Sequence, residues 1–194
     1  MKHKLMLVSL SALALAACGE RATSDAVTDN VAVAPDTSLQ NGADNMAMAP
    51  DAAAPMSGQQ FADAAAASDM FELESSKLAQ QKGQSAGVKE FAAMMIKDHT
   101  NSTAKLKTAA GEADPAVTPK PALNPEQAAN LDALRAATGA EFDALYTQQQ
   151  VAAHQKALAM LQSYAANGDV APLKAFAGET APVVEAHLKQ ISAM

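Results

Sequence analysis

The sequence predicts an all-α protein whose main domain, residues 57–194, folds as an antiparallel four-helix bundle. Apolar residues recur along this region at spacings of three and four, which is the period of one buried helix face. Helix start and stop signals, among them Ser57, Gly83 and Asn167-Gly168, divide the region into long segments joined by short turns. Because short turns make consecutive helices antiparallel neighbours, the pattern indicates a bundle.

Residues 1–17 have the pattern of an export signal. A basic start is followed by an apolar run that is too short to span a bilayer as a helix. The run ends in Leu15-Ala16-Ala17-Cys18, which resembles the lipobox of bacterial lipoproteins, whose cysteine becomes the lipidated first residue of the mature chain. A free thiol packed in a core is the alternative for Cys18, the only cysteine. We favour the lipid anchor, and Gly19 suggests, by the same resemblance, the periplasmic face of the outer membrane.

Residues 18–56 are predicted to form a lipid-anchored, disordered tether. Ala, Asp, Asn, Pro, Ser and Thr dominate the segment, and its few branched apolar side chains cannot offset the entropy lost on ordering. Met46, Met48 and Met56 could bind a soft ion such as Cu(I). Without a nearby His or Cys, however, three scattered methionines are more typical of an ordinary linker.

The charge of the chain argues against nucleic acid as a partner. Loss of residues 1–17 removes two of the 14 basic side chains and none of the 21 acidic ones, so the net charge of -7 becomes about -9. Two arginines and no tryptophan leave little to grip phosphates or stack on bases. The partners we expect are the membrane, through the anchor, and an unidentified envelope protein or small ligand.

The first two helices are predicted at about 57–82 and 85–109, each beginning at a capping serine. In the first helix, Glu72 and Glu74 lie beside the apolar stripe. At least one of these carboxylates should reach the core or its edge, where a charge without a partner is costly. In the second helix, His99 lies in the middle of the apolar stripe.

A proline-rich connection separates these helices from the rest of the domain. Pro115, Pro119 and Pro121 forbid a continuous helix at 111–124 and favour an extended chain. Ferritin-like bundles use a long connection of this kind between their second and third helices. A short helix at about 125–137 follows, opened by an asparagine cap and a first-turn proline.

The last two long helices are predicted at about 138–166 and 169–191. A capping box at Thr138 begins the first of them, and Asp169 caps the second. Pro182 lies inside the last segment and should kink that helix or split it in two.

Three histidines are predicted to share one layer of the bundle. His99, His154 and His187 each lie in an apolar stripe on a different helix, roughly 20–27 Å from the nearest turn at about 1.5 Å per residue. Isolated polar groups at that depth would lack hydrogen-bond partners. We therefore expect the imidazoles to lie close enough to share a ligand or each other, with Glu72 or Glu74 nearby.

Several short motifs follow one another between Phe61 and Ile191. They are Glu72-Leu73-Glu74 with Lys77-Leu78-Ala79, Val88-Lys89-Glu90-Phe91-Ala92 with Asp98-His99-Thr100, Gly139 with Phe142-Asp143 and Tyr146, His154, and Pro182 with His187. In this order they resemble a bacterial envelope family catalogued only as a domain of unknown function, number 4142. The resemblance implies a ferritin-like four-helix bundle and carries no established activity.

A metal site built on these histidines would differ from ferritin-like di-iron sites. Di-iron sites use Glu-x-x-His pairs, whereas the residues three before the histidines are Ile96, Val151 and Val184. An iron store or a di-iron enzyme is therefore disfavoured. A single ion of Zn, Fe, Cu or Mn, bound by the three histidines with Glu72 or Glu74, remains open.

The competing interpretation is a structural polar network, in which the same side chains hydrogen-bond across the bundle and fix its register. Two functions follow from these interpretations. The first, which the sequence favours, is a lipid-anchored envelope protein whose bundle is a binding or structural module with no catalytic residues. The second is a metal-binding redox or stress protein that uses the histidine and glutamate site.

Labelling with palmitate tests the anchor at Cys18. Radiolabelled palmitate should enter the wild-type protein in cells and should not enter Cys18→Ser, because the lipobox pattern leads to acylation at the cysteine. Equal labelling of the two proteins would remove the lipid anchor.

Overall fold

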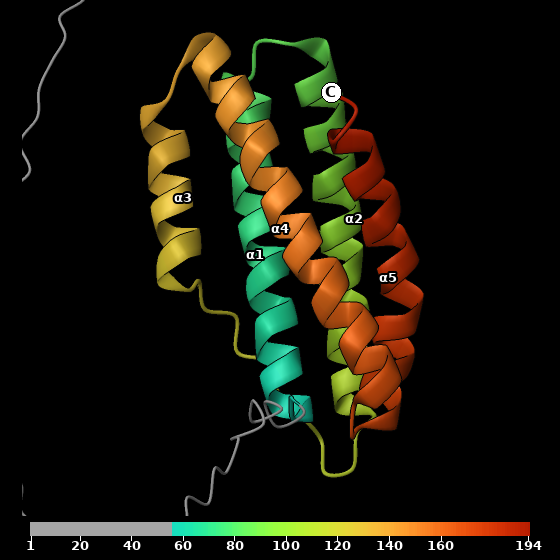
Figure 1. Cartoon of the computed structure of the whole chain (residues 1–194). Coiled ribbons are helices and arrows are strands. Elements are labelled where there is room, and N and C mark those ends of the chain that lie inside the picture. Colours follow the sequence, from blue (N-terminus) through green and yellow to red (C-terminus); the bar gives the residue numbers. More distant parts are fainter. Residues whose placement is uncertain (1–55) are drawn as a thin grey trace, which may run out of the picture. The chain divides into compact units, whose positions relative to one another are not determined.

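The computed structural model describes residues 56–194, which are helical apart from their connections (Figure 1). The predicted signal peptide, Cys18 and nearly all of the tether, with Met46 and Met48, lie outside the described residues. The helices are α1 (Gly58–Lys82), α2 (Ala86–Gly111), α3 (Pro125–Ala136), α4 (Gly139–Asn167) and α5 (Ala171–Ile191). The predicted all-α fold is confirmed. Between residues 56 and 194, none of the helices combines the length and apolar character needed to cross a membrane.

Four long helices form the bundle, and the short helix α3 lies outside it against α1 (Figure 1). Helices α1 and α5 each pack against both α2 and α4, and each long helix runs antiparallel to its two neighbours. The proline-rich connection crosses one end of the bundle, and α3 then carries the chain back to the other end. Helices α2 and α4 therefore run in parallel, and the predicted antiparallel four-helix bundle with a long connection is confirmed.

Side-chain caps begin the first two helices, as the sequence predicts. The Ser57 hydroxyl accepts a hydrogen bond from the Gln60 amide at 3.4 Å, and the Gln60 side chain accepts one from the Ser57 amide at 2.9 Å. Ser85 accepts from the Val88 amide at 3.2 Å in the same way. Asp143 on α4 accepts from two backbone amides of the α1–α2 turn, at 2.9 and 2.8 Å. This last contact holds the turn against α4.

Two details of the predicted helix starts are wrong. Thr138 makes no side-chain cap within the described chain, and the break before α4 instead uses Gly139, whose φ of 64° is readily adopted only by glycine. Asp169 does not cap α5, because it accepts a hydrogen bond from the Tyr164 hydroxyl at 2.8 Å. Helix α5 continues through Pro182, so of the two predicted effects of this proline, a kink or a split, the split does not occur.

Two apolar clusters close the two ends of the bundle. One contains Phe61, Tyr164 and Phe176, with the Phe61 and Tyr164 rings stacked at 3.9 Å. The other contains Phe91 and Tyr146, which meet edge to face at 6.4 Å. Between the clusters, every long helix contributes to a layer of buried polar side chains. These are Asp69, Glu72, Ser75, Ser76, His99, Gln149, Gln150, His154 and His187.

Replacement of Pro182 tests its cost to α5. The proline is exposed in the helix interior and cannot donate a backbone hydrogen bond. Pro182→Ala should raise the free energy of unfolding, measured in urea, by about 1–3 kcal/mol. Glu179→Ala, at an exposed position of the same helix, is the control and should change it by less than about 0.5 kcal/mol. A less stable Pro182→Ala protein would show that packing around the proline outweighs the missing hydrogen bond.

Candidate metal centre

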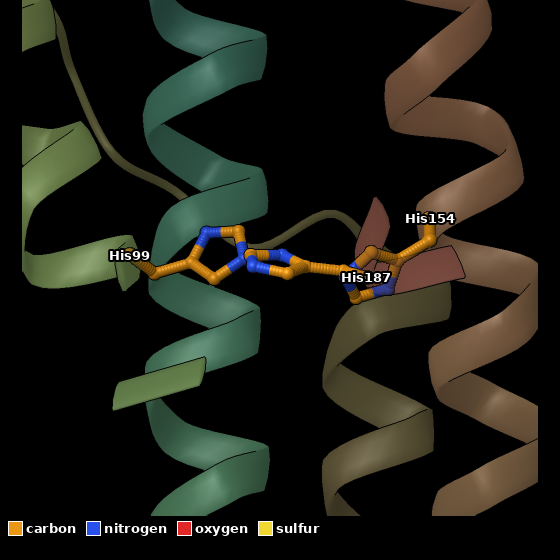
Figure 2. Close-up of side chains that lie close together, drawn as sticks. All are labelled: His99, His154 and His187. Carbon is orange, nitrogen blue, oxygen red and sulfur yellow. The ribbon is translucent and has the colours of Figure 1, made fainter. Parts of the chain in front are cut away.

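Three histidines from three helices meet in the polar layer. His99 on α2, His154 on α4 and His187 on α5 each offer one ring nitrogen, and these nitrogens all lie within 4.8 Å of one another. Figure 2 shows the three rings pointing toward a shared space. The residues are 7%, 1% and 4% exposed, respectively. The structure thus brings together the three histidines that the sequence places at a similar depth.

Two aspartates orient two of the rings. His99 Nδ1 lies 2.7 Å from Asp69 Oδ1, and the other oxygen of Asp69 accepts a hydrogen bond from the Thr103 hydroxyl at 3.0 Å. His187 Nε2 lies 3.1 Å from Asp98 Oδ2. Because a carboxylate accepts hydrogen bonds and does not donate them, each of these ring nitrogens carries a proton.

The backbone of α4 orients the third ring. His154 Nδ1 donates to the carbonyl oxygen of Gln150, one turn earlier, at 2.8 Å. Glu72 is buried beside this pair, with its Oε1 3.7 Å from the same ring nitrogen. Glu72 therefore lies next to the protonated side of the ring, and it is not part of the group of converging ligand atoms.

In the neutral form of each ring, the remaining nitrogen carries a lone pair and has no proton to donate. His99 Nε2, His154 Nε2 and His187 Nδ1 are buried, and none has a hydrogen-bond partner among residues 56–194. In that form they cannot hydrogen-bond to one another, since all three are acceptors. A metal cation can accept all three lone pairs. Metal-binding histidines commonly donate their other N–H group to a carboxylate or a backbone carbonyl, which is the arrangement seen here.

The sequence patterns single out neither aspartate. Asp69 lies three residues before Glu72 and therefore shares its helix face. This spacing is the one sequence feature that could have placed Asp69 near the histidines. Asp98 directly precedes His99 and is 32% exposed at its side chain, yet it reaches His187 on another helix. A contact of that kind leaves no signal in the sequence, because it depends on how α2 and α5 pack.

Glu74, the other acidic candidate ligand, lies away from the histidines. Its side chain is 43% exposed, and its Oε2 lies 3.5 Å from Arg135 Nη2 on α3. Residues two apart on a helix do not share a face, so the burial of Glu72 turns Glu74 outward. The structure therefore does not bring Glu74 together with the three histidines.

Burial and nearby charge set the protonation of the cluster. Burial lowers the pKa of His154 to about 4 and also lowers the pKa of His187. Burial opposes a charge on His99 as well, but the hydrogen bond to Asp69 and the charge of Glu72 outweigh it and raise the pKa of His99. His154 and His187 are therefore neutral at pH 7, the form in which histidine binds a metal.

A small cavity of about 40 Å³ leads to the cluster. Its lining includes His99 and His187 together with Asp69 and Asp98. Val183 also lines the cavity and is 44% exposed, so the cavity opens to solvent. This opening gives a small ion a route to the histidines.

Fold and site together define a helical-bundle protein with a buried cluster of three histidines. Residues 43–194 match the family described as "Domain of unknown function (DUF4142)". The chain belongs to this family, as the order of its motifs predicts. No curated protein matches the chain.

Several solved structures share the bundle. CopM in its Cu(I)-bound form is 20% identical, with 71% of this chain and 94% of that chain covered and a TM-score of 0.59. CopM in its Cu(II)-bound form is also 20% identical, with coverage of 70% and 93% and a TM-score of 0.58. A DUF305 fragment from Deinococcus radiodurans is 15% identical, with coverage of 72% and 96% and a TM-score of 0.60. At these identities the likeness shows the fold alone.

Replacement of Glu72 tests the effect of its burial, which raises its pKa from 4.5 to about 7. The folded protein therefore holds this proton more tightly than the unfolded chain does. The resulting stabilisation is full below pH 4.5 and is lost as the pH rises through 7, about 3 kcal/mol in all. Metal-free Glu72→Gln should melt near the wild-type temperature at pH 5 and above it at pH 8. A variant that melts below the wild type at both pH values would contradict this account.

Proposed function

We propose that the protein is a lipid-anchored protein of the cell envelope that binds one transition-metal ion. The ligand atoms are His99 Nε2, His154 Nε2 and His187 Nδ1. One observation carries the proposal: the three rings each bring one nitrogen within 4.8 Å of the others, and each ring has a buried nitrogen without a hydrogen-bond partner in the described part of the chain. The opposite nitrogen of each ring is already held by an oxygen acceptor, which fixes the direction of each lone pair.

A metal ion accounts for this arrangement better than a structural network does. A buried polar group without a partner costs about 1–3 kcal/mol, and the cluster contains three such nitrogens. A hydrogen-bonded network would need donors that face inward, whereas the three rings, when neutral, donate outward. Metal binding would satisfy the three lone pairs together, and its free energy would add to the stability of the fold.

Copper and zinc fit the ligands best among the candidate ions. Imidazole suits Zn, Cu, Fe and Ni, whereas Mn prefers oxygen ligands, and the converging group contains no carboxylate. The structures of CopM with Cu(I), Cu(II) and Ag support copper by analogy of fold. A di-iron site is still disfavoured, because none of the three histidines has a glutamate three residues before it.

The sequence before the bundle supports a location on the periplasmic face of the outer membrane. The lipobox pattern ends in Cys18 and is followed by Gly19. Residues 18–56 would then hold the bundle away from the lipid surface. We assign the protein a role in binding or buffering metal in the envelope, or in a stress response to it, and we assign no catalytic residue.

Chelation tests the metal site directly. Protein purified without an affinity tag or a chelator should melt at a lower temperature after chelation, and added Cu or Zn should restore it. An ion that binds only the folded protein stabilises it by about 2.7 kcal/mol at 100 times its Kd. His154→Ala should abolish the response, because it removes one of the three ligands.

Tyr146→Phe is the matched control for this experiment. It lies on the same helix and removes a buried hydrogen bond, the 2.9 Å contact between the hydroxyls of Tyr146 and Ser76, without touching the histidines. It should lower the melting temperature and keep the response to metal. If Zn, Cu, Fe and Mn all leave the wild-type melting temperature unchanged, the structural network is the correct interpretation and the metal site is wrong.

A further inference from the structure

Negative charge surrounds the three proposed ligands, although none of the ligands is itself an acid. Asp69 accepts from His99 at 2.7 Å, and Asp98 accepts from His187 at 3.1 Å. Both carboxylates also line the cavity that leads to the cluster. Within the described chain, no lysine or arginine forms an ion pair with either aspartate.

The two carboxylates would act on a bound ion through the rings. Each would be separated from the ion by one imidazole, and no lysine or arginine between residues 56 and 194 pairs with it. The attraction between a carboxylate and an ion is proportional to the charge of the ion, and it is stronger where burial lowers the effective dielectric constant. Three neutral imidazoles alone can bind both monovalent and divalent cations. The surrounding carboxylates are therefore the groups that discriminate between cations by charge.

We infer that the site selects divalent ions such as Zn²⁺ and Cu²⁺ over monovalent ions such as Cu⁺ and Ag⁺, and that Asp69 and Asp98 are the positioning residues that set this preference. The inference rests on the metal site proposed above and names the class of ion that it takes. The aspartates do not touch the ion. They hold His99 and His187 in the binding orientation, make the opposite ring nitrogens more basic, and supply charge that favours the divalent ion.

Asp69→Asn and Asp98→Asn remove the charges and keep the hydrogen bonds. An amide oxygen accepts from a ring N–H group as a carboxylate oxygen does. Next to Asp69, the Thr103 hydroxyl also lies 2.9 Å from the His99 carbonyl oxygen. In the Asp69→Asn variant, the Thr103 hydroxyl can donate to the His99 carbonyl oxygen and accept a hydrogen bond from the new amide N–H group. A change in ion preference would therefore report the charge of the aspartates and not a misplaced ring.

The test compares the Kd values of Zn²⁺ and Ag⁺ in chloride-free buffer, by competition with a chelator. Both ions have closed d shells and keep their oxidation state. The wild type should bind Zn²⁺ more tightly than Ag⁺. Each aspartate variant should lose about 10–100-fold in affinity for Zn²⁺. The loss for Ag⁺ should be about the square root of that factor, roughly 3–10-fold, because electrostatic free energy scales with the charge of the ion.

Glu90→Gln is the control, since it removes an exposed carboxylate from the same helix as Asp98 and should change neither Kd. Equal losses for the two ions, or tighter binding of Ag⁺ by the wild type, would overturn the divalent preference and leave the metal site standing. Binding of neither ion by the wild type would overturn both proposals. If circular dichroism shows that Asp69→Asn does not fold, the partly exposed Asp98→Asn carries the comparison alone.

Discussion

The structure depends on how the polar groups in the middle of the bundle are satisfied. Apolar clusters around Phe61 and Phe91 lie on either side of this layer, so its members must find partners in the layer or at its edges. The three histidines solve half of this problem by donating outward to two carboxylates and one backbone carbonyl. The inward-facing lone pairs of the three rings remain, and a bound cation would accept them.

The polar layer also joins α1 to α4 beyond the histidines. The Gln150 side chain donates to the Ser75 hydroxyl at 3.1 Å, and the hydroxyls of Ser76 and Tyr146 lie 2.9 Å apart. The backbone of Gln150 holds His154 at the same time. The orientation of a proposed ligand and the packing of two long helices therefore depend on the same residue. Glu72, buried within this set, makes the stability of the layer depend on pH.

Most of the fold could be predicted from the sequence because its signals are local. A capping serine, a glycine stop and a run of prolines each act within a few residues, and they place the ends of α1 at Gly58 and Lys82 correctly. The error at Asp169 arises because a second partner competes for the capping side chain. Asp169 has the side chain of a helix cap, but the Tyr164 hydroxyl engages it instead. No property of the isolated segment around Asp169 distinguishes these two outcomes.

By itself the sequence determined that three histidines would lie at a similar depth, because each residue of a helix advances along its axis by about 1.5 Å whatever surrounds it. Only the tertiary structure decided which acids meet them. It buries Glu72 and turns Glu74 outward, and it brings Asp98 to His187 across two helices. Depth along a helix adds up residue by residue. The rotation of each helix about its axis, which decides what each side chain faces, is set by the packing of all four long helices together.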